Sequence, residues 1–217
     1  MFRVILATQW KWTRGALLIA TCAAFALPLL SIRNASTALE EMNARDLLAI
    51  MNTIGMAYGL TAGSIGLVIA AMAWTPDHAG RHVYALALPL ARWKYVAMRF
   101  AAGALTLTAP VIALWIGGVV AIASIQIPAG LHSHAAALTI RFALATLVAY
   151  ATFFAISSGT KRTAGLILST LAGALILELV GEALNLPLRP FFLFVDFVMN
   201  WSGTLGVFNG PWMLIDV

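Results

Sequence analysis

Residues 47–74 read LLAIMNTIGMAYGLTAGSIGLVIAAMAW, a run of 28 residues without a charged side chain. A helix crosses the ~30 Å hydrocarbon core of a bilayer with about 20 apolar residues. This stretch is therefore long enough to span a membrane with some tilt. Gly55, Gly59 and Gly63 recur in it at four-residue spacing, which is typical of a face where two membrane helices pack closely. Packing within one subunit and a seam between two copies both fit this pattern.

Four further stretches of the chain are apolar enough to cross a membrane: residues 15–32, 100–131, 142–160, and 163 to about 181. Of all 217 residues, 62% are hydrophobic and 10% are charged, whereas soluble domains carry about 25% charged residues. We therefore predict an all-α, polytopic helical bundle with five transmembrane helices, forming one membrane domain over residues 1–217. The first run resembles a signal peptide in part, but its length favours a retained span.

The tail of the chain leaves two alternatives open. Pro187 and Pro190 end the fifth helix, and residues 191–199 are apolar but contain Asp196. Glycines and prolines then interrupt the pattern again. This segment is either a poor sixth span or a re-entrant stretch that leaves the C-terminus outside.

Lys and Arg predict the orientation, because they concentrate on the cytoplasmic side of membrane proteins. With the N-terminus inside, nine of them lie in inner segments: Arg3, Lys11, Arg14, Arg81, Arg92, Lys94, Arg99, Lys161 and Arg162. Four lie in outer segments: Arg33, Arg45, Arg141 and Arg189. Four tryptophans also gather at the inner side, as an interfacial aromatic belt would: Trp10, Trp12, Trp74 and Trp93. We expect a multi-pass protein of the plasma membrane, the inner membrane of a bacterium, with a cytoplasmic N-terminus.

Residues 75–99, TPDHAGRHVYALALPLARWKYVAMR, follow directly on the basic side. Thr75 suits a helix cap, Pro76 the first helical position and Asp77 the positive end of the helix dipole. A short amphipathic helix that ends at Pro89 is therefore expected here. Its apolar face fits either lipid headgroups or a groove on a cytoplasmic partner.

The succession Asp77-x2-Gly80-Arg-x2-Tyr84-x-Leu86-x-Leu-Pro89-x2-Arg92-Trp-x-Tyr95-Val resembles the permease subunits of ABC-2 type transporters. There this region contacts a separate cytoplasmic ATPase. The resemblance implies a coupling segment over residues 75–95, with ATPase contacts at Asp77, Arg81, Tyr84, Leu86 and Arg92. The lead-in Gln9-Trp-Lys-Trp-Thr-Arg14 is similar to that family's amphipathic N-terminal helix, which implies an interfacial helix over residues 1–14.

The same resemblance implies how the subunits work together. Two permease copies, or one copy with a related permease, enclose the pathway, and the partner ATPase binds ATP and Mg²⁺. The family usually has six spans, and its second and fifth spans line the path. By analogy, the translocation pathway is lined by polar residues of those two spans: Asn52, Tyr58, Thr61, Ser169 and Thr170. Export is the direction that the resemblance implies.

The chain offers little chemistry of its own. It lacks the Gly-x4-Gly-Lys-Ser/Thr loop that cradles phosphates, and Cys22 is its one cysteine. His78 and His82 have metal-compatible spacing, but a solvated polar face is the expected reading. The net charge of +5 is scattered through short loops, which argues against nucleic acid as a partner. We expect a non-catalytic subunit in the lipid bilayer that binds no metal or cofactor itself.

Glu178 is the one acid well within a predicted span. An ionised carboxylate in lipid needs a partner, and Arg141 is expected at comparable depth. We predict a structural ion pair between Arg141 and Glu178; a proton or cation site at Glu178 is the alternative.

Two other functions remain open from sequence. The chain fits a membrane anchor or assembly subunit that tethers a cytoplasmic partner. It also fits a secondary transporter that works without ATP, although such transporters show internal repeats and charged sites at the midplane. The sequence does not identify a substrate.

Overall fold

The computed structural model describes residues 1–39, 44–79, 91–125, 132–158, 161–184, 189–200, 205–210 and 212–216, and most of these are helical. In chain order the elements are α1 (Phe2–Leu39), α2 (Ala44–Ala79), α4 (Arg92–Thr106), α5 (Thr108–Ala123), β1 (His132–Ser133), α6 (Ala135–Ser158), α7 (Lys161–Ala183), α8 (Pro190–Met199), η1 (Gly206–Phe208) and β2 (Ile215–Asp216).

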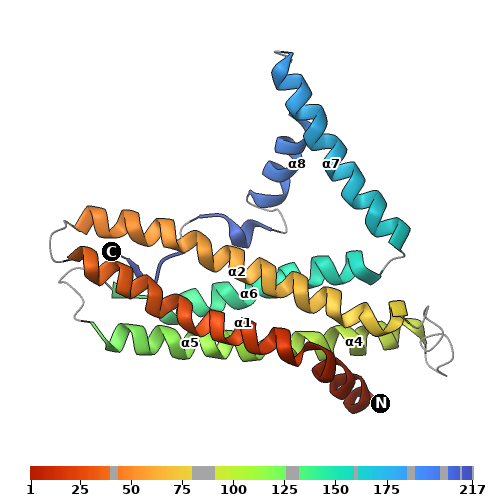
Figure 1. The fold of residues 1–217 in the computed structure, drawn as a ribbon, viewed down its shortest axis with the longest axis horizontal. Coiled ribbons are helices and arrows are strands. Elements are labelled where there is room, and N and C mark those ends of the chain that lie inside the picture. Colours follow the sequence, from red (N-terminus) through yellow and green to blue (C-terminus); the bar gives the residue numbers. More distant parts are fainter. Residues whose placement is uncertain are drawn as a thin grey trace.

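Four helical segments are long and apolar enough to cross a membrane: Phe2–Arg33, Gly55–His78, Arg92–Ala123 and Ala135–Ser158. They correspond to the first four predicted spans and lie side by side in one elongated bundle (Figure 1). The chain is therefore a multi-pass membrane protein with an all-α architecture. The fifth predicted span is helical as α7, but its role as a span stays a prediction.

Glycines let the helices of the bundle approach closely. α2 packs mainly against α6, and α1 mainly against α5. A Cβ atom on Gly66 of α2 would lie 2.7 Å from the Cβ of Ala149 on α6. A Cβ on Gly117 of α5 would lie 2.4 Å from the carbonyl oxygen of Phe25 on α1. Lipid tails are as apolar as leucine, so close packing of this kind, rather than hydrophobicity, holds membrane helices together.

The third span consists of two helices. Pro110 lacks the N–H that would bond to the carbonyl of Thr106, and α4 gives way to α5 at Leu107. α4 and α5 still follow one line through the bundle (Figure 1).

The N-terminal residues, predicted as an interfacial helix over residues 1–14, are helical from Phe2. They are the first turns of α1, continuous with the first span. These turns bend away from the rest of α1 (Figure 1). The hydroxyl of Thr13 donates to the carbonyl of Gln9 at 2.8 Å, a bond that often bends helices. Trp10 and Trp12 are about half exposed, which suits contact with headgroups.

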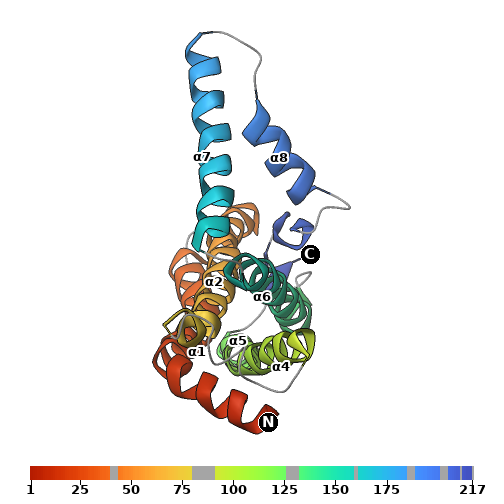
Figure 2. The same ribbon diagram turned by 90° about the vertical axis from the view of Figure 1, so that its right-hand side faces the viewer.

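α7 and α8 form a hairpin that projects from the bundle (Figures 1 and 2). Most described side chains of α7 are exposed, including Leu166, Ile176 and Leu179. α8 has ten residues, about 15 Å of helix, which is half of what a bilayer requires. Among the described residues of the tail, no helix is therefore long enough for a sixth span.

The C-terminal residues return to the bundle instead. β2 pairs antiparallel with β1, with His132 opposite Asp216 and Ser133 opposite Ile215. β1 lies between the third and fourth spans, so the C-terminus is at the end of the bundle opposite the N-terminus (Figure 1).

Candidate functional site

A buried ion pair joins the end of α2 to α4. Nη1 of Arg99 lies 2.8 Å from Oδ2 of Asp77, and the two side chains are 8% and 2% exposed. A charged side chain is costly away from water unless it is paired. These two residues therefore depend on each other where they lie.

Tyr95 completes the arrangement. Its hydroxyl donates to Oδ1 of Asp77 at 3.0 Å and accepts a hydrogen bond from Nη1 of Arg99. Nε of Arg99 donates to the carbonyl of Ala73 at 2.7 Å. Tyr95 and Arg99 are four residues apart on α4, so they share one face of that helix. We refer to Asp77, Tyr95 and Arg99 as the charge cluster.

Aromatic residues cover the charge cluster and connect it to α6. The ring of Trp74 lies 5.6 Å from the guanidinium carbon of Arg99, within range of a cation–π interaction. Its indole N–H donates to the carbonyl of Phe154 at 3.2 Å. Nε2 of His78 lies 3.0 Å from the carbonyl of Ser157. Trp74 is thus buried, and α2, α4 and α6 are tied together at one end.

The predicted ATPase-contact residues fall into three groups. Arg81, Tyr84 and Leu86 lie outside the described residues. Arg92 is the first residue of α4 and is exposed. Asp77 is buried in the charge cluster, and its contact with an ATPase stays a prediction.

The helix boundary in this region also differs from the prediction. α2 continues through Pro76 to Ala79, so Pro76 lies inside a helix and does not begin a new one. Asp77 accordingly lies in the last turn of α2, where its carboxylate meets Arg99 and not a helix N-terminus.

Sequence reasoning treated Arg99 as a charge in an inner loop and missed it as a partner of Asp77. A signal was present: Arg99 follows Tyr95 by one helical turn and directly precedes a long apolar run. A charged residue at such a position needs a partner, and Asp77 is the nearby acid in the preceding segment.

The four predicted pathway residues whose side chains the structure describes lie on different surfaces of the chain. Tyr58 is buried, and its hydroxyl bonds to that of Ser31 on α1 at 2.8 Å. Thr61 lines a groove between α1 and α2. The side chain of Asn52 lies outside the described residues.

On α7, Ser169 and Thr170 are exposed, and both hydroxyls donate to the carbonyl of Leu166. Because α7 leaves the bundle, the second and fifth predicted spans enclose no common path in one copy of the chain.

The glycine face of α2 is in contact with the C-terminal segment. A Cβ on Gly55 would lie 2.6 Å from the carbonyl oxygen of Trp212, and one on Gly59 would lie 3.6 Å from its indole ring. Gly63 faces Phe208. At this face, residues of the same subunit therefore pack closely against the glycines.

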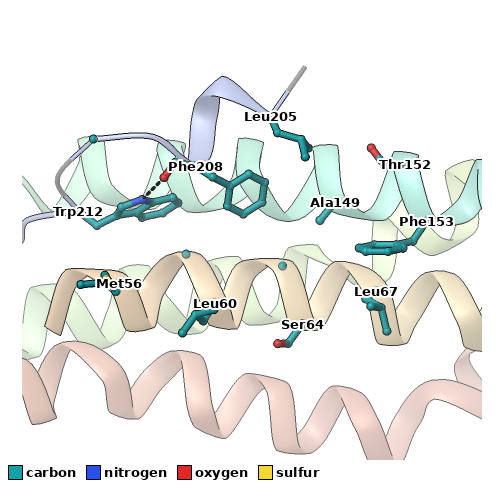
Figure 3. Close-up of a pocket in the computed structure, with 13 residues that line it drawn as sticks. Met56, Leu60, Ser64, Leu67, Ala149, Thr152, Phe153, Leu205, Phe208 and Trp212 are labelled. Atoms are coloured by element: carbon teal, nitrogen blue, oxygen red, sulfur yellow. Dashed lines mark hydrogen bonds between the residues drawn. The ribbon is translucent and has the colours of Figure 1, made fainter. Parts of the chain in front are cut away.

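Beside this contact, an apolar groove of ≈ 640 Å³ runs between α2, α6 and the C-terminal segment (Figure 3). Met56 and Trp212 lie at one end, and Leu67 and Phe153 lie at the other. Ser64 and Thr152 contribute hydroxyls; the other lining residues are apolar or glycine: Gly59, Leu60, Gly63, Ala149, Leu205, Phe208 and Gly210.

The predicted pair of Arg141 and Glu178 is not formed. Nε of Arg141 donates to the carbonyl of Val207 at 3.1 Å, and its guanidinium carbon lies 4.4 Å from the ring centroid of Trp212. Glu178 instead accepts from the backbone N–H of Phe192 at 2.8 Å. The prediction failed because the C-terminal segment, and not α7, packs beside Arg141.

Comparison of the chain with protein-family profiles, with curated proteins and with solved structures gives no match.

Proposed function

We propose that this chain is the membrane-spanning permease subunit of an ATP-driven transporter of the ABC-2 type, coupled to a separate cytoplasmic ATPase. Four membrane-spanning helices supply the bundle. The sequence has no phosphate-binding loop of its own, so a partner must supply ATP hydrolysis. The N-terminus and residues 75–95 lie in the cytoplasm in this proposal, and two permease copies form the pathway.

The observation that carries the proposal is the charge cluster at the base of the coupling segment. Residues 80–90 connect α2 to α4, and Asp77 precedes them while Tyr95 and Arg99 follow them. The ion pair thus fixes both ends of this segment to each other. A force applied by a partner at residues 80–92 would reach α2 and α4 as a unit.

The cluster also extends to α6 through Trp74 and His78. Separating Asp77 from Arg99 would leave a buried charge without its counter-charge, at a cost of ~3–5 kcal/mol. The lower-cost response to a push is therefore movement of the three helices together. This is the behaviour that a mechanical link between a motor and a membrane bundle requires.

The first experiment asks whether the motor exists. The chain is purified in mild detergent from its native membrane, and co-purifying proteins are identified and assayed for ATP hydrolysis. We expect an ATPase with a phosphate-binding loop. If no ATPase accompanies the chain, the proposal is wrong.

The second experiment locates the contact. Arg81→Glu with Tyr84→Ala should release the ATPase, whereas Lys11→Glu, a charge change of the same sign in the first turns of α1, should leave it bound. An unchanged complex and unchanged transport after the double substitution would exclude residues 80–90 as the coupling element. If the unaltered chain binds the ATPase but the complex transports nothing, the chain is better explained as a membrane anchor for the ATPase than as a permease.

A further inference from the structure

The groove between α2, α6 and the C-terminal segment lies at membrane depth. Its α2 residues, Met56 to Leu67, belong to the span Gly55–His78, and its α6 residues belong to the span Ala135–Ser158. Water is scarce at this depth, and an apolar groove of ≈ 640 Å³ falls in the size range of small-molecule sites. The occupant must therefore be apolar over most of its length.

The groove has a cationic end. Gly210 and Trp212 line it, and Arg141 contacts both: its Nη2 donates to the carbonyl of Gly210 at 3.3 Å, and its guanidinium lies over the ring of Trp212. Arg141 is partly exposed, and its Nε and Nη2 also donate to the backbone carbonyls of Val207 and Asn209, so a headgroup would meet the charge of a guanidinium that the C-terminal segment holds in place. A positive charge thus lies at the end of the groove that is nearer to the C-terminus.

The length of the groove fits one leaflet. Thr152 lines the groove eleven residues after Arg141 on the same helix, which is about 16 Å along the helix axis at 1.5 Å per residue. Half of a ~30 Å hydrocarbon core is about 15 Å. A lipid whose headgroup lies at Arg141 would therefore reach the far end of the groove with its acyl chain.

We propose that this groove binds one phospholipid with an anionic headgroup, its phosphate end at Arg141 and one acyl chain along Gly63, Ser64 and Thr152. A tail gains no hydrophobic free energy by moving from the bilayer into a groove, so shape and the headgroup charge select the ligand. Binding needs neither ATP nor a partner, so this inference goes beyond the transport function and stands apart from it.

The test uses the full chain in nanodiscs with a photoactivatable phosphatidylglycerol whose reactive group is at the acyl-chain end. Mass spectrometry maps the labelled peptides. We expect labelling on residues 56–67 and 149–153 above that on the lipid-facing residues of α5. A zwitterionic phosphatidylcholine with the same tail should label these peptides about fivefold less, since one Arg beside an anionic lipid is worth ~1 kcal/mol.

Variants make the test specific. Gly63→Leu places a side chain in the groove, where Phe208 at 3.9 Å leaves room for the first atom. Gly173→Leu is the matched control, because a Cβ there meets nothing within 4 Å. Thr152→Phe is a second way to fill the groove from an exposed position. We expect Gly63→Leu and Thr152→Phe to lower labelling to the level of α5, and Gly173→Leu to leave it unchanged.

Three outcomes would overturn the proposal. Labelling of the unaltered chain at the groove no higher than at α5 would mean ordinary contact with bulk lipid. Equal labelling by the anionic and the zwitterionic lipid would mean that Arg141 does not bind the headgroup. Absence of lipid label with crosslinks between two copies at residues 56–67 would mean that a second copy fills the groove.

Discussion

Replacing the carboxylate of Asp77 by an amide tests the charge cluster. Asp77→Asn keeps the shape of the side chain but leaves Arg99 buried without its counter-charge, so we expect a loss of ~3–5 kcal/mol in stability. The double variant Asp77→Leu with Arg99→Met removes both charges and should recover much of that loss. Thermal unfolding of the purified protein in detergent measures each effect.

Arg92→Met is the control for these variants. Arg92 is exposed at the start of α4, so its replacement should change stability by no more than ~0.5 kcal/mol. If the loss in the double variant equals the sum of the losses caused by Asp77→Leu and Arg99→Met made singly, the two charges do not stabilise each other.

The residue contacts were only partly predictable from sequence. The rule that a charge near a span needs a partner applied correctly to Arg141 and Glu178 but selected the wrong pair. Local spacing places residues on a helix face, whereas a contact such as Asp77 with Arg99 depends on how two helices meet. Helix crossing is a property of packing, which one sequence does not encode in its periodicity.

Close approach of α2 and α6 at Gly66 gives a prediction about helix packing. Gly66→Ala would place a methyl group 2.7 Å from the Cβ of Ala149 and 2.8 Å from the carbonyl of Thr146, so one helix must shift. Overpacking of this kind costs ~1–3 kcal/mol. Gly173→Ala, in open space on α7, should instead leave the melting temperature unchanged or slightly higher. A similar response of both variants in thermal melting would argue against tight α2–α6 packing.

The contribution of the C-terminal segment to the stability of the fold can be measured by replacing Trp212. This indole is buried against the glycine face of α2 and under the guanidinium of Arg141. Trp212→Ala should therefore lower stability by ~3–5 kcal/mol. Trp93→Ala, which removes an indole that is 68% exposed, should change it little in the same unfolding assay. Equal effects would mean that the segment does not pack as described.

The elements themselves were well predicted where apolar length decides them. Four predicted spans agree with the four membrane-length helices, because twenty apolar residues have one low-energy arrangement in a bilayer. The interruptions were less predictable. Pro110 divides the third span, whereas Pro76 and Pro28 lie inside continuous helices. Neighbouring helices satisfy freed backbone groups in some places and not in others, and sequence alone does not show where.

The positions of the two chain ends constrain how often the whole molecule crosses the membrane. The last turns of α6 lie at the same end of the bundle as the N-terminus, and Ile215–Asp216 lie at the opposite end beside β1 (Figure 1). The chain must therefore cover the length of the bundle once more after Ser158. α7 has 23 residues, about 35 Å of helix, which is enough for a crossing, whereas α8 is too short.

An odd number of crossings puts the two termini on opposite sides of the membrane, and this is directly measurable. Cys22, the one cysteine of the chain, is first replaced by alanine so that it cannot react. Val4→Cys and Asp216→Cys are then introduced separately. A membrane-impermeant thiol reagent applied to intact cells should label Asp216→Cys, and Val4→Cys only after the membrane is opened, because Lys and Arg favour a cytoplasmic N-terminus. Labelling of both positions from one side would require an even number of crossings. The paired strands β1 and β2 would then be separated by the bilayer, which would exclude the described return of the C-terminal segment to the far end of the bundle.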